Sequence, residues 1–164
     1  WDDLDAAFEQ VEQELAQTAR GISVLLWKGV LERTPQYAGR MAASWTYSLN
    51  TPTFVSRDQK AVEAIPEDDL SARQKGHPLA ISVANSYSAG AEKAFKLGDT
   101  AWIANGVDHG EGPYSAWVEA APLDWLRQVN HPGQPVNLTV ATVMPQVQDM
   151  TPVAAARLRS LKIG

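Results

Sequence analysis

The stretch RTPQYAGRMAASW, residues 33–45, marks the point at which a long helical pattern ends and a sheet pattern begins. Pro35 ends the helix because the residue before a proline resists the α conformation. Gly39 can take the positive φ that a tight turn needs, and the small residues after Arg40 lead into Trp45. The segment therefore predicts a sharp change of direction between a helix and a strand.

The residues before this turn predict one long helix over residues 4–33. Its apolar side chains recur at steps of three or four, which places them along one stripe of a helix. The stripe consists of Leu4, Phe8, Val11, Leu15, Ala19, Ile22, Leu26 and Val30. Aspartates at the start and Arg33 at the end also suit the helix dipole, whose N-terminus favours negative charge.

Two short segments predict the strands of a small sheet. Residues 45–49 alternate large apolar with small polar side chains, and residues 100–104 form a second candidate around Trp102. Phe54 and Val55 are candidates for the start of a further strand. The tryptophans on the expected regular elements are assigned to the core: Trp27, Trp45, Trp102 and Trp117.

Two further long helical segments are expected. The alanine-rich composition of residues 79–97 favours a helix, and residues 136–161 look helical except that Pro145 and Pro152 must kink or split the segment. Residues 57–78 are polar and are expected to form an exposed excursion. We expect a single α+β domain in which a small antiparallel sheet packs against a long N-terminal helix and a kinked C-terminal helical segment.

The composition is that of an ordinary globular protein, with 45% hydrophobic and 20% charged residues. The chain has no cysteine, which excludes disulfides, thiolate metal sites and thiol catalysis and fits a cytosolic origin. We expect no transmembrane helix because no stretch approaches about 18 consecutive apolar residues, and the acidic N-terminal segment is unlike a signal peptide. The net charge of −5 argues against a protein that grips DNA phosphates over a wide face.

The strongest candidate for a catalytic or metal site is the group Asp108, His109 and Glu111 in a glycine-rich loop. Consecutive loop residues rarely converge on one ion, whereas metal sites draw ligands from separate elements or from helical i, i+4 pairs. The alternative, a solvated polar loop, is therefore favoured. Motifs for an activated nucleophile or a phosphate-binding loop are missing from the sequence. We expect no enzymatic activity, no metal and no cofactor.

The segment TPQYAGRMAASW, which follows an amphipathic N-terminal helix, resembles a T-P-x-x-T-G-R-x-x-x-S-[WF] signature. This signature is that of the tail-completion, or neck, family of minor tail components from long-tailed double-stranded DNA phages. The matching positions are Thr34, Pro35, Gly39, Arg40, Ser44 and Trp45. Ala38 stands where the family usually has a threonine before the glycine.

Residues 96–121, KLGDTAWIANGVDHGEGPYSAWVEAA, resemble a second segment of the same family. The matching positions are Gly98, Asp99, Asn105, Pro113, Tyr114 and Glu119. Ser115 replaces the usual alanine, Ala121 replaces the usual glycine, and the insertion DHGEG before the proline is longer than typical. Residues 131–143 are similar to the start of the family's last helix. The resemblance thus covers nearly the whole chain in the family's order.

The resemblance implies a structural virion protein without catalysis, which forms a ring at the phage head–tail junction and joins the tail to the DNA-filled capsid. The implied partners are further copies of the chain, as a hexamer or else a dodecamer, a head-completion, stopper or connector protein, and a tail terminator or major tail tube protein. Genomic DNA would pass through the lumen without sequence-specific binding, and assembly would take place in the bacterial host cytoplasm. Two alternatives stay open: a tail-terminator ring that caps the tail tube, and a prophage-encoded, non-catalytic protein-binding module.

The residue types themselves favour scaffold roles for the signature. Arg40 can bridge loop carbonyls or a carboxylate, with Glu119 as a candidate partner, and Asn105 can hold a turn at the end of a strand. The two ends of the chain differ in charge, because residues 1–14 contain acids and no base while residues 157–164 contain bases and no acid. The candidate subunit interface comprises Asp2, Asp3, Asp5, Arg157, Arg159 and Lys162. The alternative explanation is that each set complements its own helix dipole.

Overall fold

The structure is a computed structural model, which describes residues 2–34, 40–57, 78–107 and 134–160. Its helices and strands are α1 (Asp2–Arg33), α2 (Arg40–Ala43), β1 (Trp45–Leu49), α4 (Pro78–Ala94), β2 (Ala101–Asn105) and α7 (Pro135–Ser160). Long helices with a two-stranded antiparallel sheet confirm the expected α+β class. The candidate loop residues Asp108, His109 and Glu111, together with Trp117, lie outside the described residues.

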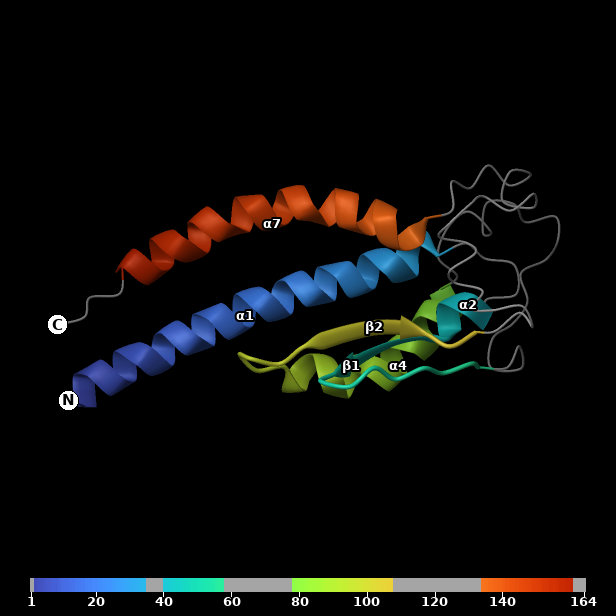
Figure 1. The fold of residues 1–164 in the computed structure, drawn as a ribbon, viewed down its shortest axis with the longest axis horizontal. Helices are drawn as coiled ribbons and strands as arrows, with labels where there is room; N and C mark the ends of the chain where they lie inside the picture. Colours follow the sequence, from blue (N-terminus) through green and yellow to red (C-terminus); the bar gives the residue numbers. More distant parts are fainter. Residues whose placement is uncertain (1, 35–39, 58–77, 108–133, 161–164) are drawn as a thin grey trace.

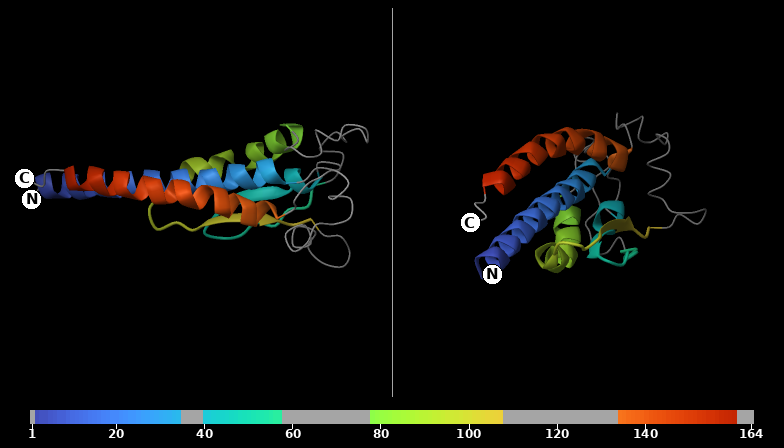
Figure 2. Two further views of the ribbon diagram at one scale, coloured as in Figure 1. Left: turned by 90° about the horizontal axis from the view of Figure 1, so that it is seen from above. Right: turned by 60° about the vertical axis from the view of Figure 1, so that its left-hand side comes forward.

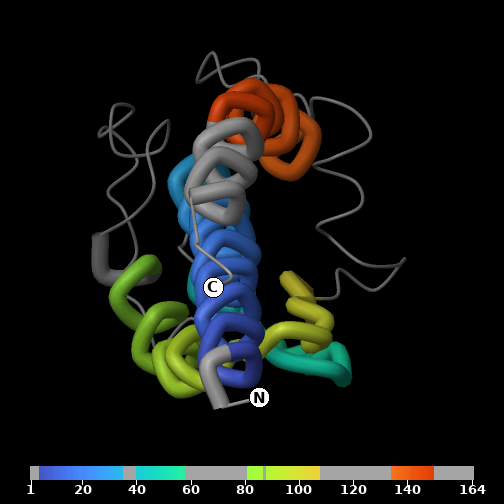
Figure 3. Tube along the Cα trace, turned by 90° about the vertical axis from the view of Figure 1, so that its left-hand side faces the viewer, coloured from blue at the N-terminus to red at the C-terminus, as the bar shows by residue number. Residues whose placement is uncertain are grey.

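The elements lie in three layers with α1 in the middle (Figure 1). α7 runs antiparallel to α1 along one side, while α4 and the sheet lie on the other side, as the end-on view also shows (Figure 3). Both long helices extend past the sheet (Figure 2). The start of α1 and the end of α7 therefore lie at the same end of the molecule.

The second half of α1 supplies the core, whereas the first half is largely exposed. Trp27, Val30 and Leu31 are buried against the sheet and α4. The apolar stripe expected from the sequence is buried only in part, since Phe8 is 59% exposed and Leu15 is 37% exposed. The reason is spatial: the sheet and α4 lie beside the second half of the helix (Figure 1).

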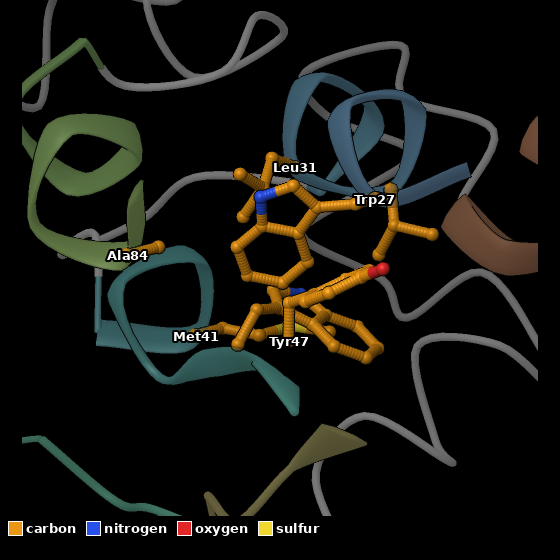
Figure 4. Packing of buried hydrophobic residues seen from close by; sticks show 7 residues of the cluster. Trp27, Leu31, Met41, Tyr47 and Ala84 are labelled. Atoms are coloured by element: carbon orange, nitrogen blue, oxygen red, sulfur yellow. The ribbon is translucent and has the colours of Figure 1, made fainter. Parts of the chain in front are cut away.

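One face of the sheet packs against α1 and α4. The pairs on this face are Trp45 with Asn105, Tyr47 with Ile103 and Leu49 with Ala101. The rings of Trp27 and Tyr47 meet edge to face, with centroids 6.1 Å apart and an interplanar angle of 63°. Leu31, Met41 and Ala84 pack in the same cluster, so α1, α2 and α4 all contribute to one core (Figure 4).

Trp102 is not the core residue expected from the sequence. It lies opposite Ser48 in the sheet register, on the face turned away from the core, and its side chain is 42% exposed. Successive side chains of a strand point to opposite faces, so the inward position of Ile103 directs Trp102 outward. Trp27 and Trp45 are buried as expected.

The segment after β1 also departs from the expectation. Phe54 and Val55 belong to no strand. The Val55 carbonyl nevertheless accepts a hydrogen bond from the Gly106 amide, just after β2, at 3.1 Å. Arg57 was expected at the start of an exposed excursion and is instead buried. The remainder of that excursion lies outside the described residues.

α7 is one continuous helix through Pro145 and Pro152, so these prolines do not split it. The helix curves along its length (Figure 1), as expected where interior prolines lack an amide donor and crowd the preceding turn. α7 approaches α1 closely at Gly29, where an added Cβ would lie 2.6 Å from Cγ2 of Thr139. Glycine at this position lets the two helix backbones come together.

Candidate functional site at the junction of α1, α2 and β1

The signature residues meet where α1, α2 and β1 come together, and Thr34 is the first of them. Its side chain is fully buried just after the last turn of α1. The Thr34 hydroxyl donates a hydrogen bond to the Val30 carbonyl at 2.6 Å and accepts one from the indole Nε1 of Trp45 at 2.9 Å. One hydroxyl thus joins the end of α1 to the first residue of β1.

α2 depends on side chains from other segments, because a single helical turn leaves most of its carbonyls without partners of its own. The Met41 carbonyl accepts a hydrogen bond from Nδ2 of Asn105 at 2.8 Å. The Ala43 carbonyl accepts one from the Arg57 guanidinium, which also donates to the Trp45 carbonyl at 3.3 Å. The last residue of β2 and the segment after β1 therefore hold the C-terminal end of α2.

Asn105 has the turn-holding role expected from the sequence. Besides its bond to α2, its Oδ1 accepts a hydrogen bond from the Val107 amide at 3.0 Å. Gly106 lies between them, pressed against the segment after β1: an added Cβ would lie 2.6 Å from the backbone nitrogen of Val55. Only glycine fits here without moving the backbone.

Ser44 fixes the position of Arg57, which reaches the same junction. The buried Ser44 hydroxyl accepts a hydrogen bond from the Arg57 amide at 2.9 Å. This contact holds the Arg57 backbone beside α2, so that its guanidinium reaches the Ala43 carbonyl at the last residue of that helix.

Arg40 does not have the role expected for it within the described part of the chain. Its guanidinium is exposed and donates to the Ser56 hydroxyl at 2.8 Å instead of bridging loop carbonyls. Arg57 has the bridging role instead, because its guanidinium is buried and donates to the carbonyls of Ala43 and Trp45. The pairing of Arg40 with Glu119 stays a prediction, since Glu119 lies outside the described residues.

The far end of the sheet is held by a second polar cluster, which includes Asp99 of the second family-like segment. Asn50, with a positive φ of 63°, donates from Nδ2 to Oδ1 of Asp99 at 2.8 Å and accepts at Oδ1 from the Thr100 amide at 2.9 Å. Oδ2 of Asp99 accepts from the Lys96 amide at 2.7 Å. These bonds lower the pKa of the Asp99 carboxyl below its ordinary value of 3.8. The bond from Asn50 has the larger effect and the bond from Lys96 the smaller.

The structure thus brings part of the predicted site together. The signature residues that share the buried junction are Thr34, Ser44, Trp45 and Asn105. The signature residues outside the described parts of the chain are Pro35, Gly39, Pro113, Tyr114 and Glu119. Sequence reasoning missed Arg57, because an arginine in a short irregular segment gives no periodic signal of burial.

The chemistry of the junction suits a scaffold. Its hydroxyl, amide and guanidinium groups bond mainly to backbone carbonyls and amides, which fixes the path of the chain. Among the residues that the structure describes, no group of three or more histidine or acidic side chains is arranged to hold a metal ion.

The candidate interface residues lie at the free ends of the two long helices. Asp2, Asp3 and Asp5 begin α1, while Arg157 and Arg159 lie in the last turns of α7. Both helix ends lie at the same end of the molecule (Figure 1). An acidic-to-basic contact between subunits that lie side by side would therefore require both to point the same way. Lys162 lies outside the described residues.

Comparison with known proteins assigns neither a family nor a function to the chain. The chain matches no family model, no curated protein and no solved structure. Among the described residues, no helix is both long and apolar enough to span a bilayer.

Proposed function

We propose that this protein is a structural subunit of the ring at the head–tail junction of a long-tailed double-stranded DNA phage. The observation that supports the proposal most is that residues of the signature hold the fold together. Thr34, Ser44 and Trp45 come from one stretch of sequence and Asn105 from another, and all four take part in one buried hydrogen-bonded junction. Side chains used in this way preserve the shape of a subunit, which is what an assembly protein must supply.

In this role the protein acts through its surfaces. Its partners are further copies of itself, with a hexamer favoured, a connector or head-completion protein on the capsid side, and a tail terminator or tail tube protein on the other. A net charge of −5 disfavours adhesion of phosphates to the ring. Genomic DNA could therefore pass through the lumen without being held.

The proposal is tested by deleting the gene from the phage that carries it. We expect the lysate to contain DNA-filled heads and finished tails that are not joined, as counted by electron microscopy. Supplying the parent chain from a plasmid should restore joined particles. Joined, infectious particles in the absence of the chain would overturn the proposal.

A matched pair of serine variants links this outcome to the junction. Ser44→Ala removes the acceptor for the Arg57 amide, whereas Ser86→Ala removes an exposed hydroxyl that donates to the Val83 carbonyl of its own helix at 2.8 Å. We expect Ser44→Ala to restore joining poorly at raised temperature and Ser86→Ala to restore it fully.

A further inference from the structure

The two long helices form an arm that projects from the rest of the molecule. We define the arm as residues 2–22 of α1 and 144–160 of α7. These limits follow from burial: among the residues whose burial is described, Ser23 is the first buried residue of α1 and Val143 is the last buried residue of α7. The arm therefore extends past the sheet and α4, as two views show (Figure 2).

The arm exposes large apolar side chains. Phe8 and Leu15 are both exposed, and because they are seven residues apart, about two helical turns, they lie on one side of α1. On α7, Met144 is 46% exposed, and Val140, one turn earlier and just outside the arm, is 41% exposed. Both helices of the arm thus offer apolar surface beyond their mutual contact. Such surface on a projecting element is typical of a contact with another protein.

Charge distinguishes the two helices of the arm. On α1, Asp5, Glu9 and Glu12 are exposed, and residues 1–14 contain no base. The end of α7 carries Arg157 and Arg159, and residues 157–164 contain no acid. Two α1 helices placed together would repel each other, whereas α1 of one arm and α7 of another would attract.

From this geometry we infer that the arm is the surface through which the protein binds a second copy of itself. The two arms point in the same direction, and α1 of each packs against α7 of the other, so that four helices form one bundle. Phe8 and Leu15 are buried in the contact, and the acidic start of each α1 lies beside the basic end of the neighbour's α7. Such a reciprocal contact joins two copies and closes on itself, so a ring of more copies would need a further, different contact. The inference therefore goes beyond the proposed function and does not rest on it.

The charges also select this arrangement over the alternatives. Arms that pointed in opposite directions would place the acidic start of α1 against the body of the other copy, away from its basic end. Arms that met through their two α1 helices would bring Asp5, Glu9 and Glu12 close to their own copies, and arms that met through their two α7 helices would bring the two basic ends together. With α1 against α7, each acidic segment has a basic segment on two sides, one from its own chain and one from the neighbour.

The test compares the self-association of the parent chain with that of variants by sedimentation equilibrium at low ionic strength. We expect the parent to associate and the Phe8→Gln, Leu15→Gln double variant to have a dissociation constant raised by about tenfold or more for each side chain. Phe54→Gln is the matched control, because Phe54 is an exposed phenylalanine outside the arm. Circular dichroism and thermal unfolding would check that all variants are folded.

Charge reversal tests the orientation. Arg157→Glu with Arg159→Glu should weaken association, and adding Asp5→Lys with Glu9→Lys should restore part of it; raised salt should reduce both effects. Association of the double glutamine variant equal to that of the parent, or a parent that stays monomeric at every concentration, would overturn the inference. Either result leaves the proposed function standing, because that is judged by joining of heads to tails in the phage.

Discussion

Replacing Arg57 with alanine is expected to lower the free energy of unfolding by about 2–4 kcal/mol. The guanidinium donates to the carbonyls of Ala43 and Trp45, both of which belong to buried residues. A hydrogen bond from a charged group contributes about 1.5–3 kcal/mol, so two independent bonds would give about 3–6 kcal/mol. The two hydrogen bonds share one side chain, and the bond to the Trp45 carbonyl is long at 3.3 Å. Their combined contribution to the free energy of unfolding is therefore smaller than this sum.

The assay is equilibrium unfolding in urea, followed by tryptophan fluorescence, since Trp27 and Trp45 lie in the core. The midpoint should fall while the slope m stays constant. Arg40→Ala is the matched control, because Arg40 is exposed and donates to the exposed Ser56. Its loss should cost less than about 0.5 kcal/mol, as is usual for surface positions.

Equal losses for Arg57→Ala and Arg40→Ala would refute the assignment of Arg57 as the residue that holds α2. If Arg57→Ala does not fold, Arg57→Lys provides the same comparison. Lysine keeps the charge but lacks the planar fork that reaches two carbonyls at once, so its stability should fall between those of the parent and a chain without the contact. A lysine variant as stable as the parent would contradict the two-carbonyl geometry.

Three further changes have defined outcomes. Gly106→Ala should lower the free energy of unfolding by about 1–3 kcal/mol in urea, because the new Cβ meets backbone at 2.6 Å. Gly90→Ala, with nothing within 4 Å of the new Cβ, should stabilise α4 by about 0.5–1 kcal/mol. A Gly106→Ala variant more stable than Gly90→Ala would contradict the packing. Thr34→Val should cost about 1–3 kcal/mol in the same assay by leaving the buried Trp45 indole N–H without its acceptor, and an unchanged midpoint would exclude that bond. Because the pKa of Asp99 is lowered in the folded chain, its contribution to stability is complete above pH 3.8, the ordinary pKa, and is lost as pH falls through the lowered pKa. Asp99→Asn should therefore make the free energy of unfolding depend less on pH in this range. The same pH dependence in both proteins would argue against the effect.

Periodic patterns in the sequence were sufficient for the long elements. The spacing of apolar residues identified α1, and the alternation over residues 45–49 identified β1, because each signal repeats over several residues. β2 was predicted one residue early, at residues 100–104, from the apolar residues around Trp102. Trp102 was assigned to the core because it lies on an expected strand, but a position on a strand does not show which face of the sheet is inward. The pattern of α1 also gave no sign that the sheet would cover only its second half, which left Phe8 and Leu15 exposed.

The junction was predictable only in part. Thr34, Ser44 and Asn105 were identified as scaffold residues through their resemblance to a signature, and their hydroxyl and amide groups do bond backbone in the structure. Arg57 could not be found in this way. Its burial follows from the unsatisfied carbonyls of α2, a short helix that becomes visible only when the chain is folded.

The pairing of β1 with β2 has a consequence for the kinetics of folding. The hydrogen bond between the Thr46 hydroxyl and the Ala104 carbonyl joins residues 58 positions apart, so the sheet closes a long loop that contains α4. Closing such a loop costs entropy before any contact repays it, and folds with distant contacts form slowly. A ribosome that has released only α1 and β1 therefore holds a chain in which Trp27 and Tyr47 still lack their full set of neighbours. The arrival of β2 sets the time at which the core can form.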